Sequence, residues 1–168
     1  MIIDLLPAFG GDGREIPVSA EIDFSAKNEY GIKFPEATVV QGKILNIGGQ
    51  LEFTGSVKTK LEFMCDRCGE WFESALSFDF SEVLKKEMDK MLEDDENPDV
   101  IFYEGNRLDI SDIIYNNLIL NLPTKKLCSK DCKGLCSVCG ANLNEKECGC
   151  EKDVTDPRFD ILDNFFKE

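Results

Sequence analysis

The chain has 168 residues, with 19 lysines and arginines against 33 aspartates and glutamates, no histidine, and a formal net charge of −14. The length suits one domain, or one domain with a small appendage, and 42% hydrophobic residues are enough for a core. The lack of histidine excludes Ser-His-Asp and Cys-His catalysis and histidine metal ligands. The acidic balance argues against broad binding to a phosphate backbone and favours a basic partner.

Alternation of apolar and polar residues predicts strands in the first half of the chain. Residues 16–24 alternate and form a half-buried strand, and residues 25–36 read as a loop. A second strand covers residues 37–47, and a Gly-Gly turn leads into a third strand whose apolar face runs through residues 51–63. A fourth strand over residues 71–80 completes an antiparallel meander.

The following segment is strongly acidic. Residues 79–104 hold ten acidic and three basic residues. The apolar spacing over residues 80–92 fits either a helix or a charged strand end. The stretch 93–99 reads as a solvated loop, which either recruits a basic partner or keeps the protein in solution.

Two helices are expected in the second half. After a short strand over residues 100–103, Asp109 or Ser111 caps a helix that runs to about residue 121 and turns an apolar face to the sheet. A last helix begins at Asp156, the expected N-cap, before Pro157.

The expected fold class is α+β. An antiparallel β meander, barrel-like and with a docking helix, occupies residues 1–123, and a small cysteine-rich zinc-binding tail with a C-terminal helix occupies residues 124–168. The apolar runs are too short to span a bilayer, and residues 1–13 lack the pattern of a signal peptide. We therefore expect a cytoplasmic protein.

Eight cysteines indicate metal binding, and they are Cys65, Cys68, Cys128, Cys132, Cys136, Cys139, Cys148 and Cys150. In the pairs Cys65–Cys68 and Cys136–Cys139, two intervening residues let both sulfurs reach one ion about 2.3 Å away. Six cysteines within the last part of the chain, with no histidine, are typical of zinc held by four thiolates. A reducing cytosol disfavours disulfides, and the common ferredoxin spacings are absent. Free thiols at a hairpin tip are the alternative for the first pair.

Spacing leaves the grouping of the ligands open. One partition places Cys136, Cys139, Cys148 and Cys150 around one ion, and Cys65, Cys68, Cys128 and Cys132 around another. The competing partition joins Cys128, Cys132, Cys136 and Cys139, and leaves Cys148 and Cys150 for the distant pair. One or two zinc ions are expected. Because each site loses four protons and gains a divalent ion, two sites would bring the net charge to about −18. Nearby positive charges would offset it, at Lys126, Lys130, Lys133 and Lys146.

Three segments resemble the YceD-like family, whose members are described as large ribosomal RNA subunit accumulation proteins. The segments read F-M-C-D-R-C-G-E-W-F, I-F-Y-E-G-N-R-L-D-I-S-D-I-I-Y-N-N-L-I-L-N-L-P and L-C-S-K-D-C-K-G-L-C-S-V-C-G-A-N-L-N, the last typical of a cysteine-rich branch. The resemblance covers about residues 55–168. It implies a bacterial cytosolic protein that supports accumulation of large-subunit ribosomal RNA, with no catalytic residues to carry over. Some members lack the tail cysteines, so the tail cannot be the whole activity.

The sequence and the resemblance together predict a non-enzymatic factor in bacterial ribosome biogenesis. Its expected partner is a basic ribosomal protein or a processing or assembly factor, without a membrane or a small-molecule substrate. Direct RNA contact is disfavoured by the net charge and would need a local basic patch. The candidates are Lys58, Lys60, Arg67, Lys125, Lys126 and the lysines of the tail. The alternative is a metal-dependent or thiol-redox enzyme acting in RNA processing.

Overall fold

The computed structural model of the chain describes residues 1–27, 29–86 and 100–150. Two compact units divide the chain. The sheet unit comprises Met1–Phe63 and Phe72–Lys125, and the cysteine unit comprises Met64–Trp71 and Lys126–Glu168, of which the structure describes residues up to 150. Each unit therefore combines segments that are far apart in the sequence, and the Cys65–Cys68 turn belongs with the later cysteines.

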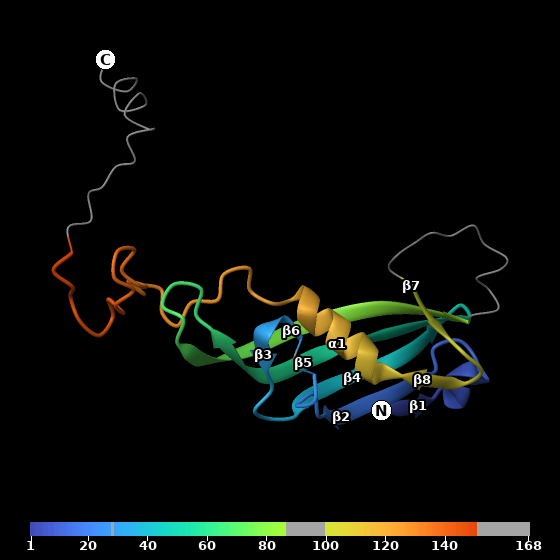
Figure 1. Cartoon of the computed structure of the whole chain (residues 1–168). Coiled ribbons are helices and arrows are strands. Elements are labelled where there is room, and N and C mark those ends of the chain that lie inside the picture. Colours follow the sequence, from blue (N-terminus) through green and yellow to red (C-terminus); the bar gives the residue numbers. More distant parts are fainter. Residues whose placement is uncertain (28, 87–99, 151–168) are drawn as a thin grey trace, which may run out of the picture. The chain divides into compact units, whose positions relative to one another are not determined.

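Figure 1 shows the elements of the described residues. The strands are β1 (Ile2–Asp4), β2 (Glu15–Ile22), β3 (Ile32–Lys33), β4 (Thr38–Ile47), β5 (Gln50–Met64), β6 (Trp71–Lys86), β7 (Val100–Tyr103) and β8 (Arg107–Asp109). The helices are the 3₁₀ turns η1 (Leu6–Gly10) and η2 (Glu29–Gly31) and the α-helix α1 (Ile110–Leu120). Among these described elements, no helix has the length and apolar character needed to cross a membrane.

The main sheet has the strand order β2-β4-β5-β6-β7, with β3 also paired to β5. The predicted alternation is confirmed in β5, where Leu51, Phe53, Val57, Leu61 and Phe63 are all buried. A second, two-stranded sheet pairs β1 with β8. Among the described strands, the order runs from β2 to β7 without closing on itself, so the expected barrel-like body is instead an open sheet.

The antiparallel direction expected for the body of residues 1–123 does not extend to β7. This strand pairs with β6 in the parallel direction, with Val83 opposite Val100. A parallel neighbour cannot follow through a tight hairpin and needs a connection of about a dozen residues or more. Residues 87–99 provide a connection of that length.

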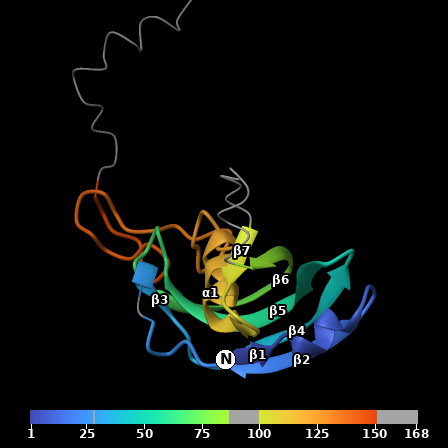
Figure 2. The same ribbon diagram turned by 90° about the vertical axis from the view of Figure 1, so that its right-hand side faces the viewer.

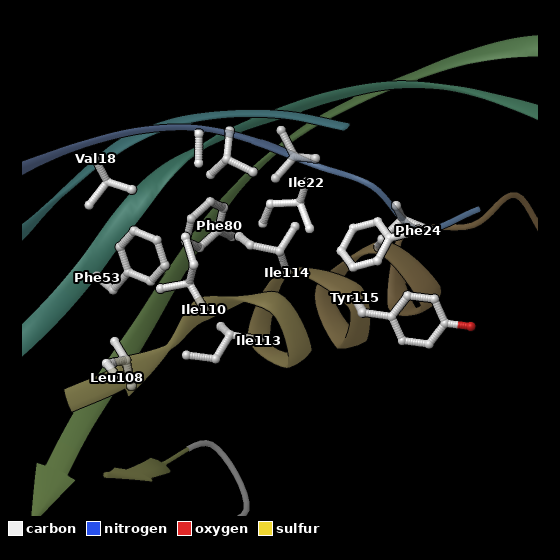
Figure 3. Packing of buried hydrophobic residues seen from close by; sticks show 14 of the residues in the cluster. Val18, Ile22, Phe24, Phe53, Phe80, Leu108, Ile110, Ile113, Ile114 and Tyr115 are labelled. Atoms are coloured by element: carbon white, nitrogen blue, oxygen red, sulfur yellow. The ribbon is translucent and has the colours of Figure 1, made fainter. Parts of the chain in front are cut away.

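Helix α1 covers the concave face of the curved main sheet (Figure 2). It begins where predicted, because the Asp109 carboxylate accepts a hydrogen bond of 2.9 Å from the Ser111 N–H and so caps the first turn. Its buried side chains include Ile110, Ile114 and Tyr115. Figure 3 shows these side chains packed against residues of β2, β5 and β6.

Two further expectations can be compared with the described residues. The strand-end alternative for residues 80–86 is right and the helical one is wrong, since β6 continues to Lys86 and buries Phe80 and Leu84 on one face. The expected loop over residues 25–36 contains η2 and the short strand β3. The helix expected after Asp156 lies outside the described residues.

Candidate metal centres

The eight predicted cysteines gather into two groups of four. The first site contains Cys65, Cys68, Cys128 and Cys132, and the second site contains Cys136, Cys139, Cys148 and Cys150. Within each site the sulfur atoms all lie within 4.8 Å of one another. This grouping is the first of the two partitions that the spacing allowed. The Cys65–Cys68 pair is therefore not an isolated pair of thiols at a hairpin tip.

The distances between sulfur atoms suit a tetrahedral ion. In the first site, Cys65 Sγ lies 3.8 Å from Cys132 Sγ, and Cys68 Sγ lies 3.7 Å from Cys128 Sγ. A tetrahedron whose corners lie about 2.3 Å from its centre has edges of about 3.8 Å. A disulfide would need about 2.05 Å, and all eight cysteines are free. The first site thus has the dimensions of a metal site with four thiolate ligands.

The two C-x-x-C-G segments adopt the same local structure. In the first knuckle (residues 65–70), the N–H of Cys65 donates to the carbonyl of Glu70 at 2.8 Å, and the N–H of Gly69 donates to the carbonyl of Cys65 at 2.9 Å. In the second knuckle (residues 136–141), Cys136 and Gly140 make the equivalent bonds, also at 2.8 and 2.9 Å. The glycine φ angles are +73° and +71°, in the region that glycine enters at no steric cost.

The other two ligands of the first site are brought in by a backbone pairing across the cysteine unit. The N–H of Asp66 donates to the carbonyl of Lys126 at 2.8 Å, and the N–H of Lys126 donates to the Asp66 carboxylate at 2.7 Å. Two residues later, the N–H of Cys128 lies 3.4 Å from Cys65 Sγ. The pairing therefore fixes the register in which the later segment meets the first knuckle, although the two segments are 60 residues apart in sequence.

Backbone amides favour the thiolate form at particular cysteines of the first site. Burial raises the pKa of Cys65, but the N–H groups of Cys128, Cys68 and Arg67 outweigh it and lower that pKa to about 6. The pKa of Cys132 is also lowered, first by the side-chain amide of Asn144. In contrast, the neighbouring Cys132 sulfur and then burial raise the pKa of Cys128 to about 12. Like charges packed this closely cannot all form unless a cation joins them.

The second site repeats this electrostatic pattern. The N–H groups of Cys139 and Val138 lower the pKa of Cys136 to about 6. The Cys139 sulfur and then burial raise the pKa of Cys150 to about 12. A divalent cation would allow all four thiols to ionise, because the thiolate is the form that binds a metal. The donor set of each site therefore fits a soft or borderline cation that prefers sulfur.

Asn144 is a site residue that the sequence interpretation missed. Its side-chain nitrogen lies 3.3 Å from Cys132 Sγ. The signal available in the sequence is the Asn142-x-Asn144 pattern shortly after the second knuckle, since asparagine side chains commonly bond to nearby backbone in turns. That pattern predicts a turn but gives no indication that the amide reaches a thiolate of the other site.

Comparison with known proteins identifies the family. Residues 53–166 match the family described as "Large ribosomal RNA subunit accumulation protein YceD". The chain is 28% identical over 165 residues to a protein of Arabidopsis thaliana described as "Large ribosomal RNA subunit accumulation protein YCED homolog 1, chloroplastic"; the match covers 78% of this chain and 50% of the relative. A Zea mays protein of the same description is 26% identical over 134 residues, covering 61% of this chain and 45% of the relative.

The chain spans about half the length of the curated relatives it matches. No solved structure matches it. The family match nevertheless includes both knuckles, the capped helix α1 and all eight cysteines, which are the features described above. On this evidence the chain belongs to the YceD family of large ribosomal RNA subunit accumulation proteins.

Proposed function

We propose that this protein is a non-enzymatic, cytoplasmic factor of bacterial ribosome biogenesis that supports accumulation of large-subunit ribosomal RNA. The observation that carries the ribosomal RNA part of the proposal is the family match over residues 53–166, together with two relatives whose descriptions name large ribosomal RNA subunit accumulation. The fold alone would not support a function of this kind, because folds host many activities.

We propose zinc as the ion in both sites, with a structural role. Each site offers four thiolates, the complete ligand set of a structural zinc ion, whereas a catalytic zinc keeps one position open for water or substrate. When bound, the ion supplies a cross-link between the knuckle and the segments that carry the other cysteines. The chain's own contribution is to hold the four sulfurs at tetrahedral spacing and to direct amide groups at them.

The enzymatic alternative has less support. Four thiolate ligands leave a zinc ion no position to activate water. A dithiol redox role for Cys65 and Cys68 would require that the pair be free to oxidise, yet both sulfurs are buried and lie beside Cys132 and Cys128. We therefore assign the cysteines to structure rather than to turnover.

A basic protein is the partner that the charge favours. The formal net charge is −14, and two zinc sites with four thiolates each would take it to about −18. Such a field accelerates encounter with basic surfaces and opposes encounter with phosphate backbones. The partner class proposed is accordingly a basic ribosomal protein or an assembly or processing factor bound to one.

The proposal is tested in a strain that lacks the gene and is complemented with plasmid-borne variants. The wild-type gene should restore the ratio of large-subunit to small-subunit ribosomal RNA. A variant with Cys65→Ser and Cys68→Ser should restore it poorly, because the first site cannot form. A normal ratio in the uncomplemented strain would contradict the proposed role. Metal content of the purified protein tests the zinc assignment separately, and two zinc ions per chain are expected.

Capture from cell extract tests the partner class. The tagged protein should retain its partner after RNase treatment if the contact is with a protein. Loss of all captured material on RNase treatment would show that RNA makes the contact and would exclude the protein-partner version.

A further inference from the structure

We propose that Asn144 couples the two cysteine sites, so that an ion bound at the second site tightens metal binding at the first. The inference rests on the proposed occupancy of both sites by metal. It goes beyond that proposal because it assigns a dependence between the sites and a residue that transmits it. Asn144 is not a ligand in this proposal; it acts on a ligand of the other site.

The position of Asn144 links the two sites. It lies on the loop of residues 140–147, between Cys139 and Cys148, which are both members of the second site. Its Nδ2 atom donates to Cys132 Sγ, a member of the first site, at 3.3 Å. A loop whose two ends are fixed by one site thus delivers a hydrogen-bond donor to the sulfur of the other.

The Asn144 side-chain amide is held by three hydrogen bonds. Its Oδ1 accepts from the N–H of Lys133 at 2.8 Å, while its Nδ2 also donates to Asn142 Oδ1 at 2.9 Å. Rotating the amide by half a turn would place oxygen against a thiolate and against another oxygen, and nitrogen against an N–H. The network therefore fixes the amide with its N–H toward Cys132.

Two backbone hydrogen bonds hold the first part of the loop against residues 134–136. The N–H of Cys136 donates to the carbonyl of Ala141 at 2.8 Å, and the N–H of Leu143 donates to the carbonyl of Gly134 at 2.9 Å. An ion shared by Cys139 and Cys148 ties the two ends of the loop. Without the ion, closing the loop costs conformational entropy, and this cost opposes the approach of Asn144 to Cys132.

A separate set of contacts holds the first site together independently of the loop. The Arg67 guanidinium donates a hydrogen bond to the carbonyl of Cys132 at 2.8 Å. The backbone carbonyl of Arg67 accepts a hydrogen bond from the N–H of Leu135 at 3.1 Å. Gly134 permits this approach, since a Cβ there would lie 3.0 Å from the Arg67 carbonyl oxygen. These bonds do not involve Asn144. Replacing Asn144 should therefore weaken the first site without dismantling it.

The expected size of the effect follows from partners of this type. A hydrogen bond to a ligand orients it and stabilises its charge, and removing such a partner typically costs 10- to 100-fold in metal affinity. We expect about tenfold for Asn144, since the bond is made to one of four ligands. Because coupling is reciprocal, the first site should tighten the second by the same factor.

A four-protein cycle tests the coupling. It compares the full chain, Asn144→Ala, the second-site variant Cys148→Ser/Cys150→Ser, and the combination of all three changes. Cobalt(II), competed with a chelator and followed by its thiolate absorption, gives the stepwise affinities of both sites where both are intact and the affinity of the first site alone in the second-site variants. Loss of the second site should weaken the first about tenfold when Asn144 is present and less than about twofold when it is absent.

Variants that retain all eight thiolates provide an independent measurement, should the second-site variant unfold. Asn144→Asp keeps the acceptor for the Lys133 N–H but cannot donate to Cys132, so it should weaken the first site at least as much as Asn144→Ala. Asn116→Ala is the matched control, because it makes the same substitution at an exposed position of α1 in the sheet unit, without changing charge. It should bind as the full chain does. In cadmium NMR, Asn144→Ala should move the resonance of the first site and leave that of the second nearly unchanged.

The outcomes separate the coupling from the metal assignment. If the full chain binds two ions and Asn144→Ala binds both with unchanged affinity, the coupling is wrong and the metal sites stand. The same holds if loss of the second site weakens the first equally with and without Asn144. A full chain that binds no thiophilic ion would overturn the metal sites and the coupling together.

Discussion

Free metal concentration should control hydrogen exchange in the cysteine unit and leave the sheet unit unaffected. The buried hydrophobic cluster of the described residues lies in the sheet unit, with Phe53, Ile114 and Leu118 among its fully buried members. In the described part of the cysteine unit, the buried side chains are those of Cys65, Cys68, Cys132 and Cys136. A unit whose buried side chains are thiols depends on the ion that joins them.

The magnitude follows from mass action. An ion at 1,000 times its dissociation constant stabilises the state that binds it by about 4 kcal/mol, or roughly a thousandfold in an opening equilibrium. If opening of the cysteine unit releases both ions, the two factors multiply. Exchange at the N–H groups of Leu135 and Leu143, both hydrogen-bonded within this unit, should then slow about a hundredfold for each tenfold rise in free metal.

The assay is hydrogen exchange at several buffered metal concentrations, under conditions where closing is faster than exchange. Amides of β4 and β5 serve as the internal control and should show no dependence on metal. Cys139→Ser removes one ligand of the second site. Exchange in the cysteine unit should then slow by only about tenfold for each tenfold rise in free metal. Equal metal dependence in both units would refute two separable units. No dependence in either would refute an essential role for the ion.

Three further substitutions, two of which have a control variant, test the local arguments. Asp109→Ala should destabilise the sheet unit by about 1 kcal/mol in urea unfolding at neutral pH, whereas Asp109→Asn should retain most of the cap. The Met1 amino group and the Ser111 N–H lower the pKa of Asp109 below 3.8, so the carboxylate stabilises the fold above that pH. The difference in stability between the unsubstituted chain and Asp109→Ala should disappear as the pH falls through the lowered pKa. Ile114→Ala should cost about 2–5 kcal/mol without changing the number of ions bound, since this side chain is fully buried in the sheet unit. Gly140→Ala should weaken the second site by about 1 kcal/mol, roughly fivefold, because its φ is +71°, while Gly149→Ala, with nothing within 4 Å of the added carbon, should bind normally.

Sequence reasoning succeeded where the pattern is local. The alternation from Leu51 to Phe63, interrupted at Gly55 and Thr59, has period two, so it fixes both the strand and its buried face. The cap at Asp109 is equally local, as one carboxylate and a nearby N–H make it. The knuckles belong to the same category, because two cysteines and a glycine determine their own turn.

The rest depended on contacts between distant segments. β7 has four residues, and neither its length nor its composition distinguishes a parallel from an antiparallel neighbour. The grouping of cysteines was undetermined for the same reason. It is set by the bonds between Asp66 and Lys126 and between Arg67 and Leu135, which join segments more than 55 residues apart. No spacing between cysteines encodes that register.

The segment matched by the family, residues 53–166, is shorter than the part of the chain that forms the hydrophobic core. The match begins at Phe53, yet α1 packs on strands that precede it, and Tyr115 lies 5.4 Å from Phe24 between ring centroids. Five of the buried residues in that earlier part are Val18, Ile22, Phe24, Val40 and Ile44. At about 1.5–3 kcal/mol for each buried side chain, their loss would remove about 8–15 kcal/mol, which is as large as the whole stability of a typical domain.

A fragment of residues 53–168 should therefore lack a cooperative thermal transition by circular dichroism. It should still bind thiophilic metal, because all eight cysteines follow Phe53 and the contacts that group them lie within the cysteine unit. The full chain is the control and should show both properties. A cooperative transition in the fragment, at a temperature close to that of the full chain, would mean that β2 and β4 are dispensable for the core and that the packing of α1 against them contributes little to stability.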